Sequence, residues 1–136
     1  MHARRQLTIA AALLFSGCAV APTQQEIAAE QFYRESIPSC ASDKECEAKM
    51  AAARNWMLSN CGFRLQTVAP DYLETFKSGD YADTSLYCRV TKTPTSQVAY
   101  RIELVAGANN PLMYSRSKLI AIHQAFNDSV NGAWRP

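Results

Sequence analysis

One helical segment limits how the cysteines of this chain can be joined. Residues 42–60 begin with a capping-box pattern, Ser42 followed by Glu45, and Glu45 and Lys49 then form an i, i+4 pair. The apolar positions at helical spacing are Cys46, Met50, Ala53 and Met57. A helix from 46 to 60 separates its ends by about 20 Å, whereas the Cα atoms of a disulfide lie within about 7 Å of each other. Cys46 therefore cannot pair with Cys61.

The first 17 residues have the three parts of a bacterial export signal. A basic start is followed by an apolar run over 7–15 and by two small residues before Cys18. This pattern resembles the lipobox of bacterial lipoproteins, in which the cysteine is acylated and becomes the first mature residue. The resemblance implies a lipid anchor at Cys18, and Ala19 after it implies the periplasmic face of the outer membrane. An ordinary secretory signal with an incidental cysteine is the alternative.

The number of cysteines predicts two disulfides. The chain has five cysteines, and an odd number leaves one thiol over in an exported protein. Assigning Cys18 to lipid leaves four, of which three pairings are possible. Two of these pairings require a bond across the length of the helix. The remaining one joins Cys40 to Cys46 and Cys61 to Cys88, in an oxidising compartment.

The rest of the chain predicts strands followed by a helix. Strand-like runs occupy 63–69, 71–76, 85–92 and 98–105, and a second amphipathic helix covers 115–132. The apolar positions of the last two strands and of that helix are Leu86, Cys88 and Val90, then Val98, Tyr100, Ile102 and Leu104, then Leu119, Ile122, Phe126 and Val130. We expect an α+β fold of two layers, with an antiparallel sheet of three to four strands and helices packed on one face, in the order α-β-β-β-β-α.

The order of the strands stays open. A bond between Cys61 and Cys88 joins the first and third strands, which are not neighbours in a simple meander. It requires either another strand order or a Cys61 that arches over the intervening strand. The chain is expected to divide into a signal peptide (1–17), a tether (18–39) and a single α+β domain (40–136). The capping-box spacing of Thr23 and Glu26 makes part of the tether either a short helix or a spacer.

The charge of the chain excludes two classes of partner. The chain has 14 basic and 12 acidic residues. Removal of Arg4 and Arg5 with the signal peptide leaves 12 basic and 12 acidic residues. A nucleic-acid-binding domain has a basic excess or stripe, and a domain held to anionic lipid by charge has a polybasic cluster. We therefore expect no nucleic acid partner, and contact with the membrane through the lipid anchor.

The sequence contains no recognisable catalytic motif. It lacks a nucleophile elbow, a P-loop and a dinucleotide-binding glycine pattern. His123 adjoins the apolar stripe of the last helix and is interpreted as a packing residue. Asp80, Asp83 and Thr84 do not have the spacing of a calcium loop and are interpreted as solvated turn residues. We expect no catalytic residue, no metal site and no cofactor.

The sheet face opposite the helices is the candidate binding surface. Strand parity directs to it Arg64, Gln66, Tyr87, Arg89, Thr91, Arg101 and Glu103, with Tyr72, Glu74 and Phe76 as additions. Arginine and tyrosine are enriched at binding hot spots, and Arg64, Tyr87, Arg89, Arg101 and Glu103 are the residues predicted to contact a partner. A solvated antiparallel face, which is normally polar, is the alternative.

Three functions are compatible with these features. The favoured one is a non-catalytic, periplasm-facing lipoprotein that binds an envelope protein as an adaptor. The second is an inhibitor or immunity protein against a toxin or wall-lytic enzyme, which inserts a loop at 78–84 or 107–114. The third is an enzyme with an unrecognised site. The segment 49–76 is similar to segments of small uncharacterised proteins from Gram-negative bacteria, which implies a domain family and no activity.

Overall fold

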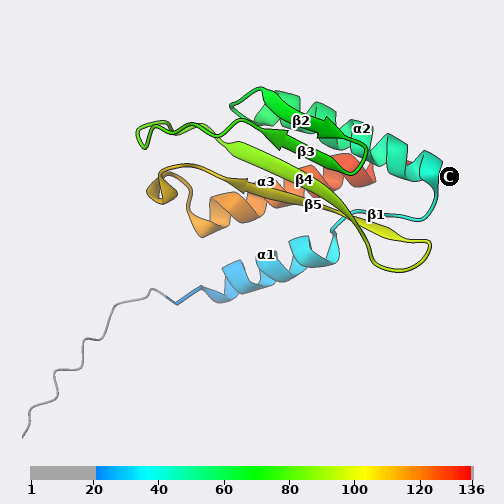
Figure 1. Ribbon diagram of the computed structural model, residues 1–136. Helices are drawn as coiled ribbons and strands as arrows, with labels where there is room; N and C mark the ends of the chain where they lie inside the picture. The colour runs from blue at the N-terminus through cyan, green and yellow to red at the C-terminus, as the bar shows by residue number, and fades with distance from the viewer. Residues whose placement is uncertain (1–20, 136) are drawn as a thin grey trace, which may run out of the picture.

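A computed structural model describes residues 21–135 of the chain, which form three helices and one sheet (Figure 1). The elements are α1 (Gln24–Glu35), β1 (Ser39–Cys40), α2 (Asp43–Asn60), β2 (Leu65–Ala69), β3 (Tyr72–Thr75), β4 (Tyr87–Pro94), β5 (Tyr100–Gly107), the 3-10 turn η1 (Pro111–Met113) and α3 (Arg116–Asn131). From α2 to α3 this is the predicted α-β-β-β-β-α order. The predicted signal peptide and Cys18 lie outside the described residues.

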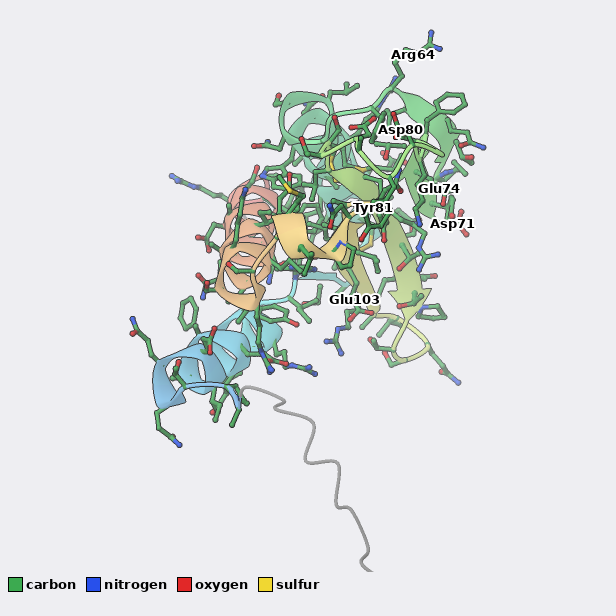
Figure 2. All side chains as sticks on the ribbon, turned by 90° about the vertical axis from the view of Figure 1, so that its left-hand side faces the viewer. Arg64, Asp71, Glu74, Asp80, Tyr81 and Glu103 are labelled. Carbon is green, nitrogen blue, oxygen red and sulfur yellow. A yellow bond between two sulfur atoms is a disulfide. The ribbon has the colours of Figure 1, made fainter. Side chains whose placement is uncertain are left out.

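The sheet is an antiparallel meander with one short additional strand. Its order is β1-β5-β4-β3-β2, so β2 to β5 pair with their neighbours along the chain and β1 closes the β5 edge. The two-residue β1 makes five strands, one more than predicted, since two residues are too few to give a periodic signal. Helices α2 and α3 lie on one face of the sheet (Figures 1 and 2). The two-layer α+β fold is confirmed.

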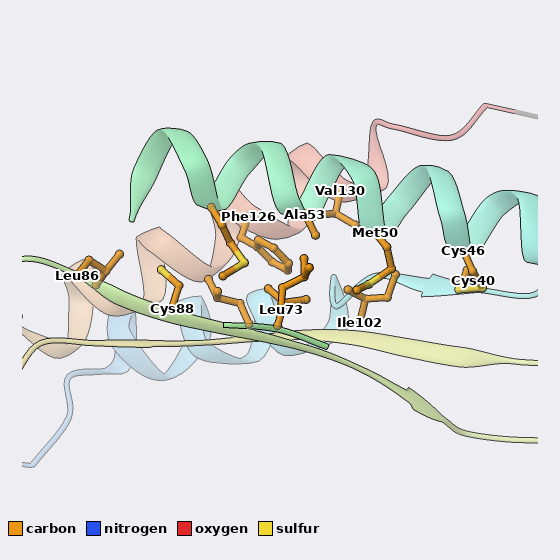
Figure 3. Close-up of a cluster of buried hydrophobic side chains, with 13 residues drawn as sticks. Cys40, Cys46, Met50, Ala53, Leu73, Leu86, Cys88, Ile102, Phe126 and Val130 are labelled. Carbon is orange, nitrogen blue, oxygen red and sulfur yellow. A yellow bond between two sulfur atoms is a disulfide. The ribbon is translucent and has the colours of Figure 1, made fainter. Parts of the chain in front are cut away.

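The core fills the space between the sheet and these two helices (Figure 3). The predicted apolar positions of α2 and β4 are all buried, as are Ile102 and Leu104 of β5. In α3, Phe126 and Val130 are fully buried, and the Phe126 ring packs edge-on against Trp56 at 5.3 Å between ring centres. Buried Ile120 joins the predicted stripe of α3, whereas Ile122 is only half-buried.

Both predicted disulfides are present, and the second one is compatible with the meander order of the strands. Cys40 is bonded to Cys46, and Cys61 to Cys88, with Cα atoms 5.2 and 6.1 Å apart. Cys61 is the C-cap residue of α2 and belongs to no strand. It reaches Cys88 from the helix layer, and the N–H of Gly62 donates to the Leu86 carbonyl at 2.9 Å. A simple meander is therefore compatible with the bond.

One strand prediction differs from the structure. Val98, predicted to lie on the apolar face of a strand, is 70% exposed in the β4–β5 turn. The turn forms because the Thr95 N–H donates to the Ala99 carbonyl and the Ser96 hydroxyl accepts from the Ala99 N–H. In β2 burial alternates along the strand, although its register with β3 shifts at a bulge between Leu65 and Thr67.

Residues 24–35 of the predicted tether form a helix that packs against the rest of the chain. The Thr23 and Glu26 side chains make the full capping box. Helix α1 contacts α3, and Asn127, which is buried, donates from Nδ2 to the Tyr33 carbonyl at 2.8 Å. The packed part of the chain thus begins at α1, ahead of the predicted boundary at residue 40.

The predicted Glu45–Lys49 pair is present, but Lys49 is buried. Its Nζ lies 2.8 Å from Oε1 of Glu45 and donates to the Ser39 carbonyl at 2.6 Å. Lys49 therefore satisfies a carbonyl of β1 as well as a carboxylate, and it ties α2 to the strand that precedes it. The hydrogen bond from Lys49, followed by the one from the Ala41 N–H, lowers the pKa of Glu45 from its ordinary 4.5.

We expect the stabilising effect of Glu45 to depend on pH. Because its pKa is lowered by folding, its contribution is complete above its ordinary pKa of 4.5 and is lost as the pH falls through the lower folded-state pKa. The free energy of unfolding of Glu45→Gln should lie below that of the wild type at neutral pH, and the difference should shrink in acid. Urea unfolding at several pH values measures both. A difference that does not change with pH would contradict the prediction.

Candidate functional site

The open sheet face brings together side chains from three neighbouring strands. The pairing of β4 with β5 sets Arg89 opposite Val105 and Thr91 opposite Glu103, while β3 sets Glu74 opposite Arg89 and Tyr72 opposite Thr91. Cross-strand partners point to the same face. In Figure 2, Glu74 lies on the side of the sheet away from the helices. We call Tyr72, Glu74, Tyr87, Arg89, Arg101 and Glu103 the sheet-face surface.

The charges of the sheet-face surface alternate. Glu74 and Arg89 face each other across the strands, and Nε of Arg101 lies 3.2 Å from Oε1 of Glu103 on β5. That N–H does not point at the carboxylate, so Nε of Arg101 is buried without a hydrogen bond. The surface thus offers both signs of charge, which suits a polar partner better than an apolar one.

The two tyrosines of the surface have different surroundings. Tyr87 lies opposite Gly107, where an added Cβ would lie 2.7 Å from the Tyr87 hydroxyl, so a side chain at 107 would require the ring to move. The Lys77 ammonium lies 4.7 Å from the centre of the Tyr87 ring. Desolvation, together with the Glu74 carboxylate, raises the pKa of Tyr72. The glycine and the lysine thus favour the observed position of Tyr87.

A shallow hollow of about 280 Å³ lies at one end of this surface, and its lining includes Glu74, Lys77, Tyr87, Arg89 and Val105. Arg64 lies outside it, at the corner where the chain enters β2, with its guanidinium 5.7 Å from the centre of the Phe76 ring. Of the five predicted contact residues, Tyr87 and Arg89 line this hollow, and Arg64 lies apart. Arg101 and Glu103 lie further along β5 and line the cavity of about 130 Å³ beside α1. Lys77 and Val105 also line the hollow, although the sequence pattern did not identify them.

The two loops predicted for an inhibitor lie side by side. Nδ2 of Asn109 donates to the carbonyls of Ser78 and Asp80, and the Tyr114 hydroxyl donates to the Thr84 carbonyl at 3.4 Å. These bonds join residues 76–86 to residues 108–115, and we call the two segments the loop end (left in Figure 1, facing the viewer in Figure 2). Asn109 is a functional candidate that gave no signal, because its partners lie about 30 residues away in the chain.

The acidic residues of the loop end support its turns. Oδ1 of Asp80 accepts from the Ala82 N–H at 2.9 Å, and Oδ1 of Asp83 accepts from the Ser85 N–H at 2.8 Å. The latter bond lowers the pKa of Asp83. Within residues 21–135, no cluster of three His, Cys, Asp or Glu side chains has the geometry to hold a metal ion.

His123 joins α3 to the edge of the sheet. Its Nδ1 lies 2.7 Å from the Leu119 carbonyl oxygen, and its Nε2 lies 3.1 Å from that of Leu104. The ring also packs against Tyr33 of α1, at 5.2 Å between ring centres, beside a cavity of about 130 Å³. These contacts connect three elements, in line with the interpretation of His123 as a packing residue.

Comparison of the chain with protein-family models, curated proteins and solved structures finds no match. Among the helices that the structure describes, none has the length and apolarity needed to cross a membrane.

Proposed function

We propose that this protein is a lipid-anchored, non-catalytic binding module of the bacterial envelope, and that its sheet-face surface receives a protein partner. The observation that carries the proposal is the uncovered sheet face. Two helices cover one side of the sheet, while the strand register directs arginine and tyrosine side chains to the other side. These residue types dominate the energy of many protein interfaces.

The anchor part of the proposal rests on the lipobox resemblance at Cys18 and on the two disulfides. Disulfides form and persist in oxidising compartments such as the periplasm. An acylated Cys18 would hold the domain at a membrane surface in that compartment. Ala19 after the cysteine favours the outer membrane, and the domain then faces the periplasm. No cofactor, metal or nucleic acid is part of this proposal.

Charge reversal on the sheet should abolish partner capture. We expect Arg89→Glu with Arg101→Glu to lose a protein that co-purifies with the wild type from crosslinked envelopes, because each change places like charges beside Glu74 or Glu103 and repels the partner's acidic groups. Mutation of one rim charge mainly slows association, whereas loss of a buried charged contact costs about 2–5 kcal/mol. Quantitative mass spectrometry of the captured proteins is the measurement.

The matched control is Lys44→Glu with Arg54→Glu, which changes the net charge equally on exposed positions of α2. The control should capture the same partner as the wild type. Both double variants must show native disulfides and a cooperative unfolding transition. If the sheet variant captures the same proteins as the wild type, or if the wild type captures none, the sheet-face surface is not the binding site.

The joined loops favour a second candidate, an inhibitor of an envelope enzyme. An inhibitor of this kind inserts a loop into an active site, and here Asn109 holds two loops together while Tyr81 and Leu112 are exposed on them. For an inhibitor, Asn109→Ala should lose a single tight partner that the sheet variant retains. The same co-purification experiment therefore separates the two functions.

A further inference from the structure

The loop end exposes three apolar or aromatic side chains. Leu112 is 87% exposed, Tyr81 is 61% exposed and Met113 is 44% exposed. Single exposed apolar residues are ordinary, but these three belong to two segments that hydrogen bonds hold side by side. Tyrosine is typical of membrane–water interfaces. Leucine and methionine side chains partition into the hydrocarbon region below the lipid headgroups.

The chain enters the domain at this same end. Thr23, which caps α1, and Ser117, in the first turn of α3, line one groove. Helix α3 directly follows η1, which carries Leu112 and Met113. Figure 1 shows the start of α1 on the same side of the molecule as the loop end. Five residues separate Cys18 from Gln24, and a fully extended chain bridges about 20 Å over that interval. An acyl group on Cys18 would therefore hold this end near the bilayer.

The contact with the bilayer rests on the apolar side chains and not on charge. Within the loop end, Lys77 stands against Asp80 and Asp83. Arg116, next to the loop end, pairs with Glu30 of α1. The loop end therefore has no excess of positive charge, and its exposed apolar and aromatic side chains are the groups that can enter a membrane interface.

We propose that the loop end is a membrane-contacting surface, at which Tyr81, Leu112 and Met113 enter the interfacial region of the bilayer that holds the Cys18 anchor. This inference rests on the proposed lipid anchor. It fixes the orientation of the domain, because the strands run away from the loop end. The sheet then stands upright on the membrane, and the sheet-face surface points sideways, where a partner in the periplasm can reach it.

Fluorescence quenching in membranes tests the orientation. The full-length, acylated protein is reconstituted into vesicles of phosphatidylethanolamine and phosphatidylglycerol that contain lipids brominated near the headgroup. Leu112→Trp places an indole at the loop end, and Val98→Trp places one in the exposed β4–β5 turn. The eight residues of β4 separate these sites by about 27 Å. Subtraction of the wild-type signal removes the contributions of Trp56 and Trp134.

We expect bromolipid to remove most of the added fluorescence of Leu112→Trp and to leave that of Val98→Trp unchanged. If the indole of Leu112→Trp is not quenched, or if that of Val98→Trp is quenched as strongly, the membrane contact is overturned, and a free loop end becomes available to a protein. The intact mass of the purified protein separates the two proposals. Absence of acyl chains on Cys18 refutes the anchor and with it this inference, whereas an acylated protein without quenching refutes the membrane contact alone.

Discussion

Replacing Phe126 with alanine is expected to lower the free energy of unfolding by about 3–5 kcal/mol. The Phe126 side chain is fully buried where α3 faces α2 and the sheet, and its ring packs edge-on against Trp56. Removal of the ring leaves a cavity that the disulfide-linked layers around it cannot close freely. Small domains have a total stability of about 5–15 kcal/mol, so the change removes a large part of it. Equilibrium unfolding in guanidinium chloride measures the loss.

Phe32→Ala is the matched control for this experiment. It deletes the same atoms from a phenylalanine that is 59% exposed on α1. Substitutions at such positions usually change stability by about 0.5 kcal/mol or less. Equal losses for Phe32→Ala and Phe126→Ala would show that Phe126 does not occupy the packed centre of the core.

The second large effect is expected from removal of the Cys61–Cys88 disulfide. This bond closes 27 residues, and the loop-entropy relation gives about 3.5 kcal/mol for a loop of that length. The double variant Cys61→Ala with Cys88→Ala also loses a bond between the helix layer and the sheet layer, and Cys88 is 1% exposed. We expect a cooperative transition at a much lower guanidinium concentration than in the wild type.

The other disulfide provides the comparison. Cys40 and Cys46 are 6 residues apart, and the same relation gives about 2.2 kcal/mol for that loop. Cys40→Ala with Cys46→Ala should therefore be the more stable double variant, by about 1 kcal/mol. The opposite order of stability would contradict the loop-entropy estimate. It would mean that the Cys40–Cys46 bond stabilises the protein mainly through native contacts at the start of α2, such as those of Lys49.

The disulfide pairing was predictable because one local element decided it. A helix has a fixed rise per residue, so the positions of Cys46 and Cys61 excluded two pairings without knowledge of the sheet. The strand order was not predictable in the same way. The prediction counted Cys61 with the first strand, whereas it caps α2. The boundary between a helix and the next strand depends on contacts between residues that are distant in sequence. The hydrogen bond between Gly62 and Leu86 is one such contact.

The candidate site was predictable in its composition and not in its arrangement. Alternation along β4 and β5 placed Tyr87, Arg89, Arg101 and Glu103 on one face, because the strand period is two. The opposition of Glu74 to Arg89 depends on the register between β3 and β4, which the pattern does not reveal. Burial of Lys49 was missed for a similar reason, since its acceptor on Ser39 belongs to a strand of two residues.

Under the proposed lipid anchor, the edges of the sheet determine how neighbouring molecules can coexist on a membrane. Proteins held by lipid anchors meet at high two-dimensional concentration and in similar orientations, and unpaired strand edges then invite one sheet to extend into the next. Here β1 occupies the first part of the β5 edge, His123 contacts the Leu104 carbonyl further along, and the bulge between Leu65 and Thr67 disrupts the β2 edge. Dense packing of this domain on a membrane is therefore compatible with each copy remaining a separate folded unit.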